Sequence, residues 1–166
     1  MPSRSTTQKA KEDLRERKSP STAAGEFVHE EIEHVRQGKH GARSPQQAIA
    51  IGLSKARRAG IPLPPPRKGK VKESTRRSAS RDFKKGQAGV ASKPSARASR
   101  ARKEALQREP HDSASHRALS SQARKAARSR TSRERQDAAE QAVETKGKSG
   151  LHRAAKKAAR TRASHA

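Results

Sequence analysis

The 166-residue sequence predicts a mostly disordered chain with a small all-α element, a two-helix hairpin. Three features of the composition predict this fold class. Lys and Arg number 41 against 16 Asp and Glu, hydrophobic residues make up 28% of the chain, and aromatic residues make up 1%. We expect this apolar content to be too small to offset the ~1–2 kcal/mol of backbone entropy that each ordered residue costs. A globular enzyme of this length is therefore excluded, and no catalytic residue is predicted.

The large apolar residues and the positive charges lie in different parts of the chain. Nine of the 18 Val, Ile, Leu, Met and Phe residues lie between Phe27 and Leu63, whereas residues 67–166 hold 29 Lys and Arg against nine Asp and Glu. The sequence therefore predicts four segments: a disordered basic arm over residues 1–22, an αα unit over 23–61, a polyproline linker over 62–66 and a disordered cationic tail over 67–166.

The first helix of the αα unit is predicted over residues 25–37. Val28, Ile32 and Val35 follow one another at the i, i+4 and i+7 spacing that places side chains on one helix face. Gly38 then provides a left-handed stop. We expect the three aliphatic side chains to pack on the second helix.

The second helix is predicted over residues 45–59 and has stronger boundary signals. Ser44 begins a capping box with Gln47, and Pro45 suits the first helical position. Gly60 suits the position after the last turn. The side chains expected to face the first helix are those of Ile49 and Leu53.

The tail is of low complexity, and the stiff polyproline linker is expected to hold it away from the αα unit. Residues 123–132 and 155–164 form a degenerate repeat that matches at seven of ten positions. Because short helices with crowded like charges are marginal in water, we expect helices in the tail to be transient and to form when phosphates neutralise it. The segments with favourable helix propensity are 99–108, 116–130, 133–145 and 151–162.

The cations of the tail are the main functional signal. A net charge of +25 points to a polyanionic partner, and nucleic acid is the common polyanion of the cell. The near absence of aromatic residues argues against base stacking, so we expect phosphate contacts with little sequence preference. The predicted DNA-binding residues are Arg97, Arg100, Arg102, Lys103, Arg124, Lys125, Arg128, Arg130, Lys156, Lys157, Arg160 and Arg162.

Three basic residues of the second helix, Lys55, Arg57 and Arg58, are weaker candidates for DNA contact. They would read DNA if the helix pair were a helix-turn-helix. However, its six-residue connection is longer than the usual turn of about three to four residues, and the third helix that normally completes the core is missing. A solvated polar helix face is the commoner role of such residues.

The segment from His29 to His34 resembles a zinc-hydrolase motif, but its spacing differs. That motif needs two histidines at i and i+4, whereas these lie at i and i+5, about 140° apart around a helix. The chain also has no cysteine. We therefore predict no metal site and no cofactor.

Two stretches, residues 26–32 (EFVHEEI) and 47–60 (QAIAIGLSKARRAG), resemble a family of small bacterial domains. Those domains pair an FVHEEM-like helix with RQAIAIALSEARKAG and are often labelled as DNA-binding or plasmid-stabilisation proteins. The resemblance covers about 40 of the 166 residues and departs from the pattern at Gln46, Gly52 and Lys55. The tail is similar to the Ala/Lys/Arg-rich arms of bacterial histone-H1-like proteins. These resemblances imply a bacterial source and DNA binding, without a mechanism.

The sequence thus predicts a non-enzymatic, nucleoid-associated DNA-binding protein of the bacterial cytoplasm. No run approaches the roughly 18 apolar residues of a membrane span, so no membrane partner is expected. A homo-oligomer or a protein partner is expected through the αα unit, whose apolar faces are too small for a stable monomer. The alternatives are an RNA- or ribosome-associated basic factor, a protein-interaction adaptor whose tail only localises it, and a small regulator or antitoxin.

Overall fold

The computed structural model describes residues 3–89 and 95–164, which form helices joined by turns and contain no strand. The prediction of a mostly disordered chain with one two-helix hairpin is therefore wrong. The chain divides into two compact units, Met1–Gln122 and Ala123–Ala166. The elements are α1 (Arg4–Arg15), α2 (Pro20–Arg36), α3 (Pro45–Arg58), α4 (Glu73–Gln87), α5 (Ala96–Gln107), the 3-10 helix η1 (Asp112–Ala114), α6 (His116–Arg128) and α7 (Ser132–Ala163).

The core of the first unit is built mostly from alanine, which explains why the composition misled the prediction. A count of large apolar side chains leaves alanine out, although alanine is the best helix former and costs no side-chain entropy on burial. Phe27 and Ile61 are the large side chains of one core cluster, and Val35 is that of a second. The fully buried alanines around them are Ala10, Ala23, Ala24, Ala42, Ala48, Ala56 and Ala114.

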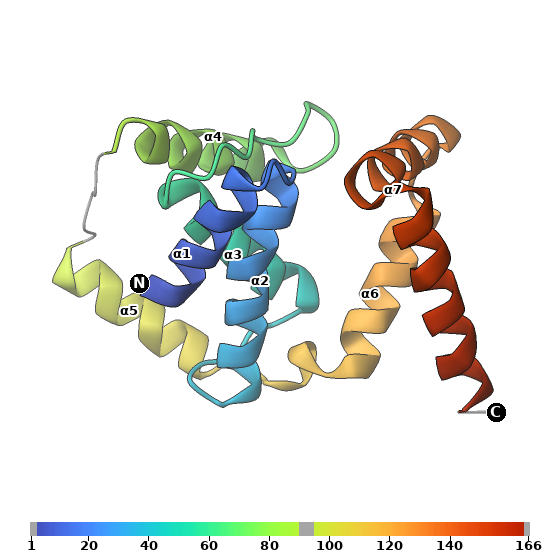
Figure 1. Ribbon diagram of the computed structural model, residues 1–166. Coiled ribbons are helices and arrows are strands. Elements are labelled where there is room, and N and C mark those ends of the chain that lie inside the picture. Colours follow the sequence, from blue (N-terminus) through green and yellow to red (C-terminus); the bar gives the residue numbers. More distant parts are fainter. Residues whose placement is uncertain (1–2, 90–94, 165–166) are drawn as a thin grey trace. The chain divides into compact units, whose positions relative to one another are not determined.

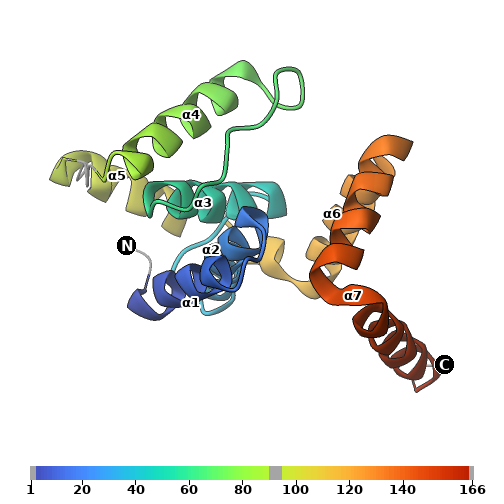
Figure 2. The ribbon, with the colours of Figure 1, turned by 45° about the horizontal axis from the view of Figure 1, so that its top comes forward.

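Helix α2 contacts both α1 and α3, and α3 in turn contacts α4, so the four helices pack in chain order (Figures 1 and 2). The helix begins at Pro20 rather than near residue 25, because Ser19 caps it as Ser44 caps α3. Its buried face also differs from the predicted one. Phe27 and Val35 are fully buried, whereas Val28 and Ile32 of the predicted stripe are only half-buried.

Helix α3 confirms the predicted second helix. The Ser44 hydroxyl accepts a hydrogen bond from the Gln47 N–H at 3.3 Å. The Gln47 side chain accepts from the Arg43 N–H at 2.9 Å, one residue before the position that a capping box uses. Gly60 follows the helix with φ of 87°, a left-handed conformation that favours glycine. The side chains of Ile49 and Leu53 are half-buried.

Gly52 lets α2 and α3 cross closely. A Cβ atom at this position would lie 2.7 Å from the Val28 Cα and 2.9 Å from the Phe27 carbonyl oxygen. The glycine that weakens the helix locally is therefore required by the approach of the two backbones.

The predicted disordered arm forms α1, which packs on α2. The Ser3 hydroxyl caps the helix by accepting from the Thr6 N–H at 3.0 Å. Thr6 and Ala10, one helical turn apart, are buried. The Ser3 N–H donates to the Glu30 carboxylate of α2 at 2.8 Å. A cap and two small inward-facing residues thus order a segment whose net charge suggested disorder.

The polyproline linker does not act as a spacer. Leu63 packs against the core cluster of Phe27 and Ile61. The chain then returns as α4 to lie against α3. Gly86 makes this contact close, since a Cβ atom there would lie 1.8 Å from the Arg57 carbonyl oxygen. The tail as predicted therefore begins with a helix that belongs to the folded unit.

Residues after α5 complete the core of the first unit. Ala114 of η1 is fully buried in the cluster that contains Val35 and Ala42. The Arg36 side chain donates from Nε to the Ala114 carbonyl at 2.9 Å, and the Ala42 N–H donates to the Pro110 carbonyl at 2.9 Å. This segment closes the ends of α2 and α3, although it lies 68 to 78 residues from its partners along the chain.

The second unit consists of the end of α6 and of α7. Thr131 and Glu134 form a capping box at the start of α7. Gly147, with φ of 66° and ψ of 166°, interrupts the helical backbone and bends α7 into two segments, which Figure 1 shows. Helices α5, α6 and both parts of α7 lie where helix propensity favoured them, but they are ordered rather than transient.

Candidate nucleic-acid interface

Two of the three candidate cations of α3 are engaged inside the first unit. The Lys55 ammonium forms an ion pair with the Glu31 carboxylate, whose side chain is 1% exposed. Arg57 is buried and donates from Nε to the Leu63 carbonyl at 3.2 Å and from Nη2 to the Pro64 carbonyl at 3.4 Å. Burial lowers the pKa of Arg57, and the charge of Asp82 acts in the opposite direction. Both side chains therefore stabilise the fold.

The third candidate, Arg58, is exposed and lies beside α4. Its Nε is 3.6 Å from the Asp82 carboxylate, and its Nη2 donates to the Ser54 hydroxyl at 2.9 Å. The same Asp82 carboxylate accepts from the Ser54 hydroxyl at 2.6 Å. Arg58 therefore shares in a polar contact that joins α3 to α4, and half of its side chain stays open to solvent.

The first turn of α4 partly neutralises its own cations. The Glu73 carboxylate lies 2.7 Å from Arg76 and 3.3 Å from Arg77. Hydrogen bonding from Arg76 lowers the pKa of Glu73 to about 2, with a smaller effect from Arg77, and it raises the pKa of Arg76. These arginines are therefore less available to phosphate than their exposure suggests.

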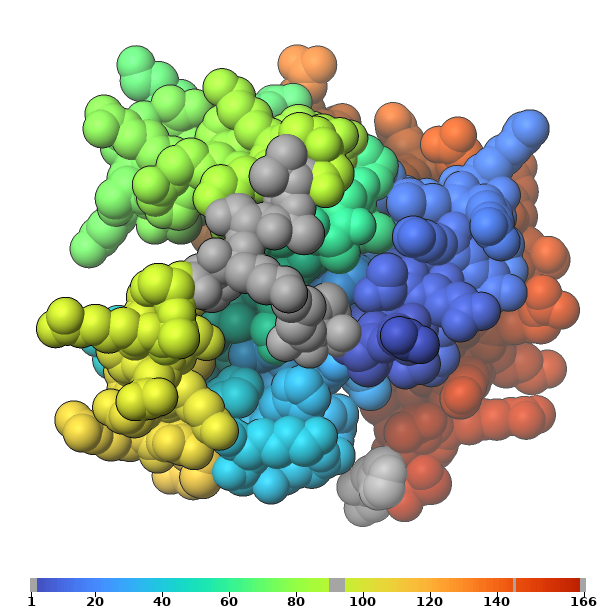
Figure 3. Space-filling view, turned by 90° about the vertical axis from the view of Figure 1, so that its left-hand side faces the viewer, coloured from blue at the N-terminus to red at the C-terminus, as the bar shows by residue number. Residues whose placement is uncertain are grey.

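The four predicted cations of α5 are exposed. They are Arg97, Arg100, Arg102 and Lys103. No ion pair joins any of them to another residue of the described ranges. Figure 3 shows long side chains of this segment, in yellow, projecting from the face that it views. The α5 cations can therefore meet an anion without first breaking an internal contact.

Helix α6 separates its cations from its packed face. Ala118, Leu119 and Gln122 are half-buried, and the Gln122 side chain hydrogen-bonds with that of Gln46 on α3. The exposed cations lie on another side of the helix, within an arc of about 100° around its axis. They are the predicted Arg124, Lys125 and Arg128, together with Arg117, which sequence reasoning missed although it precedes Arg124 by seven residues. The predicted Arg130 is exposed between α6 and α7.

The bend at Gly147 separates two parts of α7 that differ in charge. Residues 132–146 contain four carboxylates and three cations, whereas residues 148–163 contain six cations and no carboxylate. The predicted Lys156, Lys157 and Arg160 lie on one face, and Arg162 lies on the opposite side. Arg153 completes that face at the i, i+3, i+4 and i+7 spacing. We call Arg153, Lys156, Lys157 and Arg160, all exposed, the α7 cationic face.

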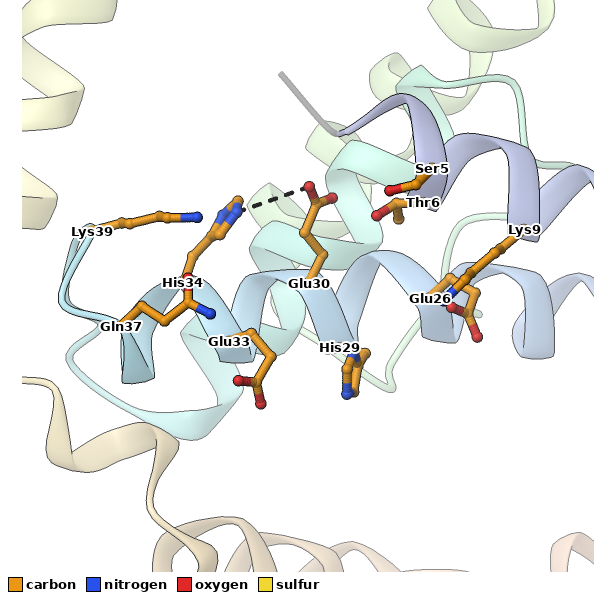
Figure 4. A pocket seen from close by; sticks show the side chains of 10 residues that line it. All are labelled: Ser5, Thr6, Lys9, Glu26, His29, Glu30, Glu33, His34, Gln37 and Lys39. Atoms are coloured by element: carbon orange, nitrogen blue, oxygen red, sulfur yellow. Dashed lines mark ion pairs between the residues drawn. The ribbon is translucent and has the colours of Figure 1, made fainter.

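A shallow hollow of about 220 Å³ lies between α1 and α2, and it is lined by carboxylates and lysines (Figure 4). Glu30 and His34 face each other in it, with 3.9 Å between Oε1 and Nε2. Burial lowers the pKa of His34, and the charges of Lys55 and Lys39 act in the same direction. His29 is exposed and also lines this hollow, but it is not among the residues whose potential ligand atoms lie together with those of His34.

Comparison of the chain with protein families, with curated proteins and with solved structures gives no match. None of the helices in the described ranges combines the length and the apolar character needed to cross a bilayer. The geometry of the cationic helices is therefore what supports a functional conclusion.

Proposed function

We propose that the protein is a non-enzymatic, nucleoid-associated protein that binds double-stranded DNA through its phosphates, without sequence preference. The α7 cationic face carries this proposal. It presents four exposed cations on one side of a helix segment without carboxylates, and none of the four has an ion-pair partner among the described residues.

The spacing of these cations suits a duplex backbone. Positions i to i+7 of a helix span about 10 Å, at a rise of 1.5 Å per residue. Each DNA strand carries one phosphate per roughly 3.4 Å of axis, so about three phosphates of a strand lie within that length. Long Lys and Arg side chains on one helix face can therefore reach successive phosphates together.

The exposed cations outside α7 can contact phosphates in the same way. Those of α5 and α6 add exposed arginines and lysines that form no ion pair with a described carboxylate. Phe83 is the only aromatic residue after the proline-rich segment, and it is half-buried on α4. The chain thus offers many phosphate contacts and hardly any surface for base stacking, which favours duplex DNA over single strands.

The test compares two variants that remove four charges each. The first is Arg153→Gln, Lys156→Gln, Lys157→Gln and Arg160→Gln. The control is Arg4→Gln, Lys9→Gln, Lys11→Gln and Arg15→Gln, which removes exposed cations of α1. The dissociation constant for a mixed-sequence DNA duplex is measured by fluorescence anisotropy at several salt concentrations, and a structured RNA serves as competitor.

We expect the α7 variant to bind more weakly and to lose up to about 3.6 from the slope of log affinity against log salt, since each phosphate contact contributes about 0.9. The α1 variant should keep most of the slope. Equal losses in the two variants would show that only the total charge matters. Preference of the wild-type protein for the RNA competitor at physiological salt would replace the DNA proposal by the RNA-associated alternative.

A further inference from the structure

Three potential metal ligands converge where α2 ends. Glu31 and His34 lie three residues apart on one face of α2. Gly38 then takes a left-handed conformation, with φ of 69°, and the chain turns back so that His40 reaches the same place. One carboxylate oxygen and one nitrogen of each imidazole all lie within 4.8 Å of one another.

The position of His40 is fixed by its neighbours. Gly41 packs so closely on the backbone of Glu109 that a Cβ atom would lie 1.8 Å from its carbonyl oxygen. The Gly41 N–H also donates to the Leu106 carbonyl at 2.8 Å. The loop therefore holds His40 against α2. The imidazole rings of His34 and His40 meet edge to face, with 6.1 Å between their centroids.

The hydrogen bonds of His40 leave one nitrogen facing a carboxylate. Its Nδ1 lies 3.1 Å from the Gly41 carbonyl oxygen, which can only accept, so Nδ1 carries a hydrogen. Its Nε2 lies 3.1 Å from Glu31 Oε1. Nε2 is therefore the ring nitrogen that can bind a cation beside this carboxylate. A backbone carbonyl that holds the other ring nitrogen is the usual support of a metal-binding histidine.

We propose that Glu31, His34 and His40 bind one divalent transition-metal ion of the Zn²⁺ class. Two imidazoles and a carboxylate are a common protein ligand set for Zn²⁺. Ligand atoms lie about 2.0–2.2 Å from zinc, which places neighbouring donors roughly 3–3.5 Å apart. The His40–Glu31 pair already meets this spacing, and a nitrogen of the half-buried His34 ring lies within 4.8 Å of both other donors. The proposal does not depend on DNA binding.

Lys55 is the internal competitor for this site. Its ammonium pairs with Oε2 of Glu31, while Oε1 faces His40. The Lys55 side chain is 18% exposed and can swing toward solvent, whereas the Glu31 side chain is 1% exposed. A metal ion would therefore bind the carboxylate against the repulsion of Lys55, and removal of this charge should strengthen metal binding.

The test titrates the full-length protein with Zn²⁺ by calorimetry and follows Co²⁺ by its visible absorption. We expect one ion per chain and cobalt bands typical of low coordination number. His34→Gln and His40→Gln should each weaken binding by at least about tenfold. His29→Gln removes an exposed histidine from the same helix and should leave the affinity unchanged.

Lys55→Gln keeps all three ligands and removes the charge that opposes the metal ion. Its Zn²⁺ affinity should rise, and Zn²⁺ should increase its melting temperature more than that of the wild type. The proposal is overturned if the wild type binds no ion, if His34→Gln and His40→Gln bind like His29→Gln, or if Lys55→Gln binds no more tightly than the wild type. Circular dichroism of each variant without metal shows whether the helices are retained.

Discussion

Small residues decide how closely the helices of the first unit approach. The inward-facing positions of α1, α2 and α3 are mainly alanines, and Gly52 stands where α2 and α3 cross. Such an interface has little room for adjustment because any added atom meets backbone rather than a flexible side chain. A methyl group added by Gly→Ala therefore has two opposing effects here: it raises helix propensity, and it can overlap the neighbouring backbone.

We predict opposite effects of the same substitution at two glycines. Gly52→Ala should destabilise the protein by about 1–3 kcal/mol, because the new Cβ would overlap the Val28 backbone. Gly25→Ala, at an exposed position of α2 with no atom within 4 Å of the new Cβ, should stabilise it by roughly 0.5–1 kcal/mol. Urea unfolding measures both. A more stable Gly52→Ala protein would contradict the close crossing.

At the scale of one element, α4 has one face packed on α3 and a charged first turn. Asp82 meets Ser54 and Arg58 of α3, and Gly86 approaches the Arg57 carbonyl oxygen. Glu73, in the first turn, binds two arginines and also suits the positive end of the helix dipole. Ionised Glu73 thus favours the first turn through its two arginines and the helix dipole.

The carboxyl group of Glu73 should titrate near pH 2 in the folded protein, against its ordinary value of 4.5. Because the unfolded chain takes up this proton first, the contribution of Glu73 to stability is complete above pH 4.5 and is lost as the pH falls toward 2. Arg76→Gln removes the main partner and should raise the pKa toward 4.5. NMR titration measures it, with Lys84→Gln as control. Titration near 4.5 in the wild type would show that the ion pair does not persist in solution.

At the scale of the whole molecule, the core of the first unit is completed by segments that lie far from α2 and α3 along the chain. The homo-oligomer or protein partner expected through the αα unit stays a prediction. Within the chain, α1, α4 and η1 pack on α2 or α3. Among the described residues, only Val71 and Val143 are large exposed hydrophobic side chains.

A chain ending at residue 109 should be less stable than one ending at residue 122. The shorter chain loses the hydrogen bonds from Arg36 to Ala114 and from Ala42 to Pro110, at about 1 kcal/mol each, and uncovers Val35. The longer chain should keep the urea midpoint of the first unit in the full-length protein. Equal midpoints for the two truncated chains would show that η1 contributes nothing to the core.

Local signals in the sequence predicted local structure well. The cap at Ser44, the turns at Gly38 and Gly60, and the helical segments of the tail all follow from side chains within a few residues of one another. The buried stripe of α2 was misplaced because Glu31 stands in it, and a carboxylate reads as a surface residue until its partner is known.

Distant partners account for what the sequence did not predict. Lys55 and Arg57 look like free cations on a helix, yet their partners lie on another helix and in the proline-rich segment. His40 meets Glu31 only after the turn at Gly38. The exposure of the cations of α5, α6 and α7 could be predicted because it needs no partner, and their contact with DNA stays a prediction. The positions of Arg117 and Arg153 on the same helix faces follow from the helix period alone.

The burial of Ala114 also constrains how the protein is made. On a translating ribosome, the helices around Phe27 emerge long before the segment that covers Val35 and Ala48. The nascent chain therefore exposes an incomplete core while the basic segments between residues 67 and 109 are being synthesised beside ribosomal RNA. Completion of the first unit must await synthesis of residues 110–114, so a pause or premature stop before that point leaves a cationic, partly folded product.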